Sequence, residues 1–161
     1  MKINNLRDLL LEQLRDRYSA ASQQASMYPK LAEAASHPEL KDIISKDIDA
    51  NKNHQKKLAE VFAQLGEEPD GEQCEGTLGL VNEANELLHY TDTSMIKDIG
   101  IAVSIQHINH HDIAGYKSCA VYAEAIEEKT LAVTLGEMLE DEKSTDESLN
   151  TWVVQTLKSK P

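Results

Sequence analysis

The chain has few of the residues that interrupt helices or contact nucleic acids. Its 161 residues include 7 glycines and 4 prolines, and aromatic residues make up 4% of the total. Basic residues number 16 against 28 acidic ones, which gives a formal net charge of −12. Phosphate contacts need Lys and Arg gathered on one face, so this composition excludes a nucleic-acid-binding protein. Binding to an anionic membrane surface is excluded for the same reason, because it also needs basic residues gathered on one face.

We also expect no secretory targeting segment and no membrane span, and the sequence has no cysteine motif. Its start, MKINNLRDLLLEQLRDRY, is charged and helical throughout, unlike a secretory signal, and no apolar run approaches the length of a membrane span. Cys74 and Cys119 lie far apart, with no CxxC pattern. We therefore expect a cytoplasmic protein with two reduced thiols rather than a disulfide.

Apolar residues recur with a helical period along most of the chain. Five of the glycines and prolines fall in GEEPDGEQCEGTLG (66–79), which predicts one long loop. We expect Ser36 to cap the second helix, with Pro38 in its first turn, and Thr93 or Ser94 to cap the third long helix. The predicted long helices span about 3–34, 38–65, 94–123 and 129–157, and a short helix spans 78–89.

Four helices of similar length, joined by two tight turns and one long connection, predict an all-α four-helix bundle. The long connection lies between the second and third long helices, where a ferritin-like bundle has its crossover. The short helix lies within this crossover. The sequence has no strand pattern, no repeat and no low-complexity segment, so we expect residues 1–161 to form a single domain.

The third long helix contains the unusual sequence IQHINHHDIAGY. On a helical wheel, Asn109 and Asp112 fall on the face defined by the isoleucines, whereas His107, His110 and His111 fall on the opposite side. His107 and His111, one turn apart, could hold an adventitious divalent ion, but two ligands make a weak site. We expect the histidines to face solvent or an oligomer contact, and the aspartate to face the core.

The same test places polar residues on the buried face of every long helix, in its middle third. A buried carboxylate costs several kcal/mol unless it is paired or ligated, so these positions predict a site, or the remains of one. Antiparallel packing brings them to similar heights in the bundle. They are Gln13, Arg17, Gln24, Asp47, Asn51, His54, Asn109, Asp112, Glu142 and Asp146.

Several segments carry a family likeness. LRDRYSA, LAEVFAQLGEEP, NEANELL, DIAGY and LEDEKSTDESL resemble the YciE/YciF-type ferritin-like proteins, which are bacterial, stress-associated and of unknown biochemical activity. The resemblance covers nearly the whole chain and is strongest at EDEKSTD, where the family has EEEKATD. It implies a rubrerythrin-like bundle, an extra short helix near a dimer interface, and a di-iron centre.

The di-iron ligands implied by the resemblance are only partly present. Such sites use a Glu from each of two helices and a Glu-x-x-His from each of the other two. At the corresponding positions this chain has Ala21, Asn51 with His54, Asp112 with Asn109, and Glu142 with Thr145. Three clear carboxylates and one imidazole could hold one ion rather than two, iron or another divalent metal. The predicted metal ligands are His54, Asp112, Glu142, Asp146 and Asp47.

Arg17 offers another way to balance these buried charges. It enters the same core, and a guanidinium beside Asp112, Glu142 or Asp146 would replace the missing cation by bidentate pairing.

Three functional interpretations follow. The sequence favours a cytoplasmic, homodimeric, stress-associated protein with a degenerate metal site and no catalytic residues. The second interpretation is a rubrerythrin-like oxidase or peroxide reductase that cycles iron among His54, Asp112, Glu142 and Asp146. The third is an acidic protein-interaction module. The homodimer is implied by the resemblance, and LGLVNEANELL offers an apolar edge on a helix too short to be stable alone.

Overall fold

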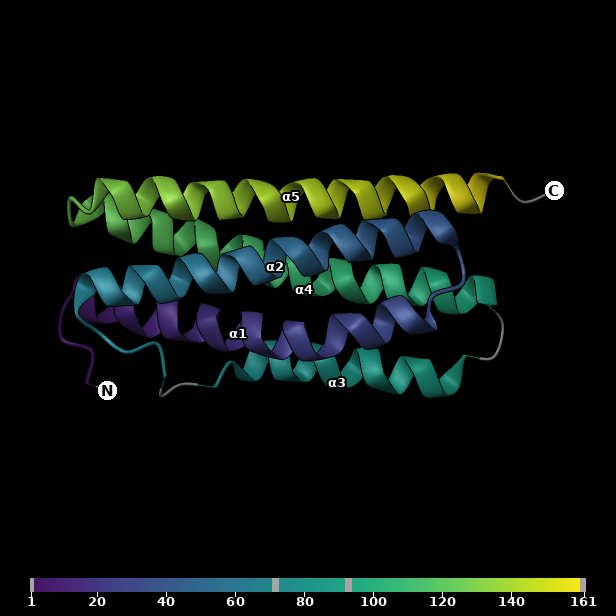
Figure 1. Cartoon of the computed structure of the whole chain (residues 1–161), viewed down its shortest axis with the longest axis horizontal. Helices are drawn as coiled ribbons and strands as arrows, with labels where there is room; N and C mark the ends of the chain where they lie inside the picture. Colours follow the sequence, from purple (N-terminus) through teal and green to yellow (C-terminus); the bar gives the residue numbers. More distant parts are fainter. Residues whose placement is uncertain (1, 71–72, 92–93, 160–161) are drawn as a thin grey trace.

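The computed structural model describes residues 2–70, 73–91 and 94–159, and within them it contains helices and no strand. Figure 1 shows four long helices side by side, with a shorter helix along one side of the bundle. The elements are α1 (Leu6–Ala34), α2 (Pro38–Leu65), α3 (Glu75–Tyr90), α4 (Ser94–Ala125) and α5 (Lys129–Lys158). The predicted four-helix bundle is confirmed, and no described helix is long and apolar enough to cross a membrane.

The long helices form a ring in which each neighbour is antiparallel. Helix α1 contacts α2 and α4, and α5 contacts the same two helices from the other side (Figure 1). Because α2 and α4 run in the same direction, the chain must return along the bundle between them. Helix α3 lies in this return connection and packs against α1 and α4. This is the predicted crossover.

The start of α2 differs from the prediction. Its N-cap is His37, which makes no side-chain capping hydrogen bond. The backbone N–H groups of Ser36 and His37 instead donate to the two carboxylate oxygens of Asp98 on α4, at 2.7 and 2.9 Å. The prediction of Ser36 as the cap was wrong, because a carboxylate distant in sequence binds this helix start. Of the two predicted caps of α4, Thr93 lies outside the described residues.

Helix α3 begins earlier than predicted, at Glu75, so the connecting loop is shorter. Cys74 caps the helix, because its Sγ accepts a hydrogen bond from the Thr77 N–H at 3.4 Å. A Cβ at Gly76 would lie 2.7 Å from Nε2 of His111 on α4. This glycine therefore permits a close helix–helix contact, whereas the sequence pattern suggested a loop residue.

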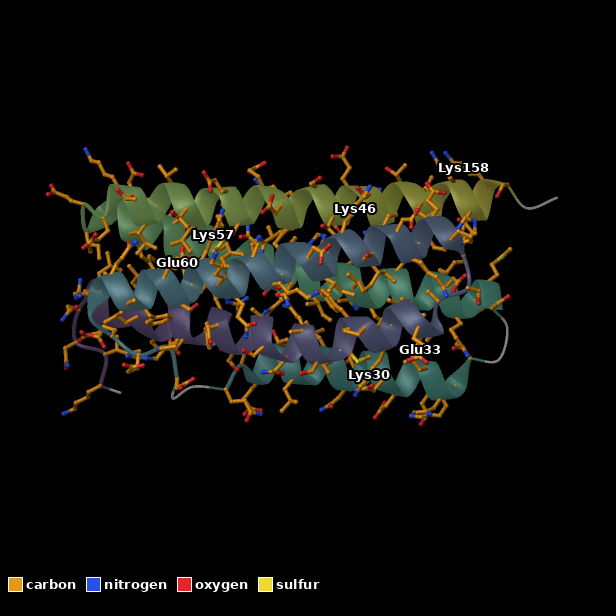
Figure 2. All side chains as sticks on the ribbon, in the orientation of Figure 1. Lys30, Glu33, Lys46, Lys57, Glu60 and Lys158 are labelled. Atoms are coloured by element: carbon orange, nitrogen blue, oxygen red, sulfur yellow. The ribbon has the colours of Figure 1, made fainter. Side chains whose placement is uncertain are left out.

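The hydrophobic core consists of two clusters, one toward each end of the bundle, and polar residues separate them. The first cluster includes Leu10, Leu14, Leu58, Phe62, Tyr116, Leu135 and Met138. The second includes Tyr28, Leu31, Leu40, Ile44, Ile101, Ile105, Leu149 and Trp152. Burial of apolar surface stabilises the bundle far more than its surface ion pairs do. One such pair joins Nζ of Lys57, labelled in Figure 2, to Glu137 on α5 at 3.0 Å.

Candidate functional site

Eight polar side chains lie between the two hydrophobic clusters, and we call them the polar layer. Each is at most 4% exposed, which confirms the predicted inward orientation of these eight. Gln13 and Asp146, also predicted to be inward, are only partly buried. The polar layer consists of Arg17, Gln24, Asp47, Asn51, His54, Asn109, Asp112 and Glu142.

Arg17 and Asp112 form a buried ion pair between α1 and α4. Nη1 of Arg17 donates to Oδ1 of Asp112 at 2.6 Å, and each residue is 2% exposed. The side-chain amide of Gln24 donates to the other carboxylate oxygen. Both oxygens of Asp112 are therefore bound by α1, as expected for an arginine that replaces a cation.

The local structure holds Arg17 in place. Its Nη2 lies 2.5 Å from Oδ2 of Asp16, and its Nη1 lies 3.4 Å from the backbone carbonyl of His111. Gly115 leaves room for the side chain, because a Cβ there would lie 2.6 Å from Cδ and Nε of Arg17. Burial alone would lower the pKa of Arg17, but Asp112 and Asp16 outweigh it and raise the pKa. The guanidinium is therefore a permanent buried charge.

His54 and Glu142 form the second contact of the layer, between α2 and α5. Nδ1 of His54 lies 3.2 Å from Oε1 of Glu142, a charge contact without hydrogen-bond geometry, and Nε2 lies 3.0 Å from Oδ2 of Asp141. Nδ2 of Asn109 donates to Oε2 of Glu142 at 2.6 Å. Burial would lower the pKa of His54, yet Glu142 and Asp141 raise it. Burial raises the pKa of Glu142, against the lowering effect of His54.

Asp47 is one of four residues of the layer with a buried side-chain atom that has no hydrogen-bond partner in the described part of the chain, beside Arg17, His54 and Asn109. Its Oδ2 is buried and has no hydrogen-bond partner among the described residues. Burial raises the pKa of Asp47 well above its usual value, and the negative charges of Glu142 and Asp112 add to the effect. Burial therefore makes the charged form of Asp47 more costly in the folded chain than in the unfolded chain.

Asn51 and Ala21, two residues that stand where the resemblance implies carboxylates, contact each other. Nδ2 of Asn51 donates to the backbone carbonyl of Ala21 at 2.9 Å. An amide–carbonyl hydrogen bond between α2 and α1 thus takes the place of two charged side chains. It joins the two helices without requiring any cation.

Asp146 does not join the polar layer. Its Oδ1 accepts a hydrogen bond from Gln106 at 2.9 Å, and its Oδ2 lies 3.1 Å from Nε2 of His110. Its side chain is 23% exposed. The prediction of a central buried position was wrong, because polar side chains of α4 bind this carboxylate at the edge of the α4–α5 contact.

His111 also differs from its predicted position. His107 and His110 are exposed as expected, but the His111 side chain is 31% exposed and lies beneath α3. Its Nδ1 is 3.2 Å from Nη1 of Arg17 and 3.4 Å from the Thr77 hydroxyl. The helical wheel placed His111 correctly relative to the four-helix core. It gave no account of the short helix that covers this side.

Across the described ranges, one group of three metal-ligating side chains has its ligand atoms within 4.8 Å of one another: Asp16, Cys74 and His111. None of the five predicted ligands belongs to this group. A di-iron centre needs carboxylates that bridge two cations, and Asp112 is already neutralised by Arg17. The polar layer as folded does not fit two irons.

The comparisons with known proteins agree with the sequence resemblance. Residues 5–160 match the family described as Domain of unknown function (DUF892). The chain belongs to this family. Protein YciF of Escherichia coli (strain K12) is 27% identical over 161 residues, which cover 99% of this chain and 97% of that protein.

Several solved structures also resemble this chain. The crystal structure of the E. coli stress protein YciF matches with a TM-score of 0.93 and 26% identity, over 98% of this chain and 100% of that one. YcfI from Rhodopseudomonas palustris matches with a TM-score of 0.90 and 30% identity, over 93% of this chain and 96% of that one. A ferritin-like, diiron-carboxylate protein from Bacillus anthracis str. Ames matches with a TM-score of 0.73 and 18% identity, over 94% of this chain and 99% of that one. This last likeness shows the fold, and the bundle is ferritin-like.

Proposed function

We propose that this chain is a non-catalytic DUF892 protein in which a buried arginine has replaced the metal centre of the ferritin-like bundle. The observation that carries the proposal is the contact between Arg17 and Asp112, 2.6 Å long and 2% exposed on both sides. A fixed guanidinium supplies the positive charge that a carboxylate in this position otherwise takes from a metal ion. The related YciF is described as a stress protein. A core that is neutralised by its own side chains is consistent with a structural role under stress rather than a catalytic one. In this proposal the folded bundle and its acidic surface perform that role.

Charge balance supports this proposal over di-iron oxidase chemistry. The layer contains Asp112, Glu142 and Asp47 as acids, with Arg17 and His54 as their partners. Arg17 lies 2.6 Å from Asp112 and His54 lies 3.2 Å from Glu142, so each of these two carboxylates has a basic partner within the layer. Two iron ions would add positive charge that these residues do not need.

A second candidate is a single divalent ion at His54, Glu142 and Asp47, whose ligand atoms would have to move closer together, because they do not all lie within 4.8 Å of one another in this structure. The observation in its favour is that Oδ2 of Asp47 and Nδ1 of His54 are buried without hydrogen-bond partners. Such atoms are costly to bury, and an ion would satisfy them. In this second candidate the histidine and two carboxylates would be deprotonated ligands.

Iron stoichiometry distinguishes these functions. Untagged protein would be incubated anaerobically with excess Fe²⁺, freed of loosely bound ions and analysed for metal, beside a His54→Gln variant. We expect no iron whose binding depends on His54, so the two proteins should contain equal amounts, and we expect an unchanged melting temperature after chelator treatment. One ion per chain that disappears in the variant would favour the second candidate. Two irons per chain with oxygen-dependent oxidation would contradict the proposal.

A further inference from the structure

A second cluster of metal-ligating side chains lies outside the polar layer, on the side of the bundle that α3 covers. Asp16 comes from α1, Cys74 is the cap of α3, and His111 comes from α4. Their ligand atoms all lie within 4.8 Å of one another, although the three residues are far apart in the sequence. A thiolate, an imidazole and a carboxylate are ligands typical of zinc and similar ions.

The cluster is built by close packing rather than by chance proximity on a surface. Gly76 allows α3 to approach Nε2 of His111, and the Cys74 N–H donates to the Ser19 hydroxyl at 3.0 Å. The Thr77 hydroxyl lies 3.3 Å from Sγ of Cys74 and 3.4 Å from Nδ1 of His111. These contacts fix the sulfur and the imidazole relative to each other.

The Arg17 guanidinium lies at this cluster. Its Nη2 is 2.5 Å from Asp16 and 3.7 Å from Sγ of Cys74, and its Nη1 is 3.2 Å from Nδ1 of His111. One positively charged group therefore contacts all three side chains. A surface pocket of about 310 Å³, lined in part by Asp16, Arg17 and His111, opens beside it. This pocket gives solvent ions a route to the cluster.

We infer that Asp16, Cys74 and His111 form a binding site for one divalent ion of the zinc class, for which the Arg17 guanidinium competes. When the ion binds, Asp16 exchanges Nη2 of Arg17 for the metal, while Nη1 keeps its contact with Asp112. The Cys74 thiol releases its proton to solvent, because the thiolate is the ligand. Since the guanidinium remains close to the ion, repulsion between the two positive charges weakens binding.

Anaerobic titration with Co²⁺ in the presence of a reductant tests this site, because a cobalt–thiolate bond has a characteristic charge-transfer absorption. We expect the absorption to saturate at one ion per chain and to be reversed by Zn²⁺. Cys74→Ser should abolish it while keeping the helix cap, since serine is a good N-cap residue. Cys119→Ser is the matched control, because it removes the other buried thiol, and should leave the titration unchanged.

The double variant Arg17→Gln/Asp112→Asn tests the competition while keeping the buried pair uncharged. We expect it to bind Co²⁺ about tenfold more tightly than the wild type, because Asp16 no longer pairs with a guanidinium, although the negative charge of Asp112 is lost as well. Equal affinity of the two proteins would show that Arg17 does not compete with the ion and would overturn that part of the inference. Absence of the thiolate absorption in both proteins, or its persistence in Cys74→Ser, would overturn the inference. Binding that lacks this absorption and disappears in Glu142→Gln would do the same, and would also place the ion in the polar layer, against the proposed function.

Discussion

Gly115 on α4 lies directly against the side chain of Arg17 on α1. A Cβ at this position would be 2.6 Å from Cδ and Nε of the arginine and 2.7 Å from its Cζ. The guanidinium is held by Asp112 and Asp16, so the arginine cannot move aside without losing these contacts. The buried position of the Arg17 guanidinium therefore depends on a glycine at position 115.

Gly115→Ala should therefore destabilise the protein. Overpacking of a close contact costs about 1–3 kcal/mol, and here it also strains a buried ion pair. Gly136→Ala in α5 is the matched control, because a Cβ there meets nothing within 4 Å. The control should stabilise the helix by about 0.4–1 kcal/mol. Urea unfolding of the two variants measures the difference, and equal effects would show that Arg17 adapts freely.

The stability of the bundle should fall as pH rises from about 5 to 8. The pKa values of Asp47, Glu142 and His54 are all raised above their ordinary values of 3.8, 4.5 and 6.5. A raised pKa gives stability that is complete below the unfolded-state value and is lost as pH rises through the folded-state value. The loss begins above pH 4 for the carboxyl groups and above 6.5 for the histidine. Urea unfolding at pH 5 and pH 8 should give the larger free energy at pH 5.

Asp47→Asn separates this effect from the repulsion among surface charges. The variant cannot lose a proton at this position, so its drop in stability between pH 5 and 8 should be smaller than that of the wild type. We expect the difference to be resolved by the two unfolding curves, because burial raises the pKa of Asp47 well above its usual value. Asp49→Asn removes the same charge from an exposed side chain of α2 and should leave the drop nearly unchanged. If both variants lose the same amount of stability between pH 5 and 8, the pH dependence does not come from the buried carboxyl group of Asp47.

Homodimer formation stays a prediction. The structure indicates that the contact between the two subunits does not use the apolar edge of α3 that the sequence suggested. Leu80, Val81, Leu87 and Leu88 of α3 are partly buried against the bundle, so the apolar edge predicted for dimerisation is used within the chain. Tyr90, the last residue of α3, is 82% exposed, and Ile96 on α4 is 51% exposed. Light scattering should give twice the chain mass of 17.9 kDa, and Ile96→Ser should lower it. A monomer at micromolar concentration would contradict the dimer.

The sequence predicted the helices and the inward face of each because both follow from local periodicity. Arg17, Asp47, His54, Asp112 and Glu142 interrupt apolar stripes, and a wheel locates such residues without tertiary information. The pairing of Arg17 with an inward carboxylate was predicted from charge balance, and the contact with Asp112 confirms it. The pair is not bidentate as expected, because Nη2 binds Asp16 and Gln24 binds the second oxygen of Asp112.

The features that sequence reasoning missed depend on contacts between distant segments. Asp98 binds the start of α2 across 61 and 62 residues of sequence, which no capping pattern signals. The cluster of Asp16, Cys74 and His111 exists only because α3 packs over α4. A signal was present in the glycine and cysteine of 74–76, but the same residues are typical of a loop. Their role becomes visible only when the position of His111 is known.

The double-mutant cycle of Arg17→Gln and Asp112→Asn tests the central claim most directly. The claim is that these two residues neutralise each other in the core in place of a metal. Arg17→Gln leaves the buried Asp112 carboxylate without its charged partner, which costs about 3–5 kcal/mol, and Asp112→Asn leaves Arg17 with Asp16 alone, which should cost less. The double variant removes both charges of the buried pair. Urea unfolding at pH 7.5 should therefore give a double variant much more stable than the sum of the single effects predicts, by about 2 kcal/mol or more. Single effects that add within about 0.5 kcal/mol would show that the two residues are independent and would contradict the account.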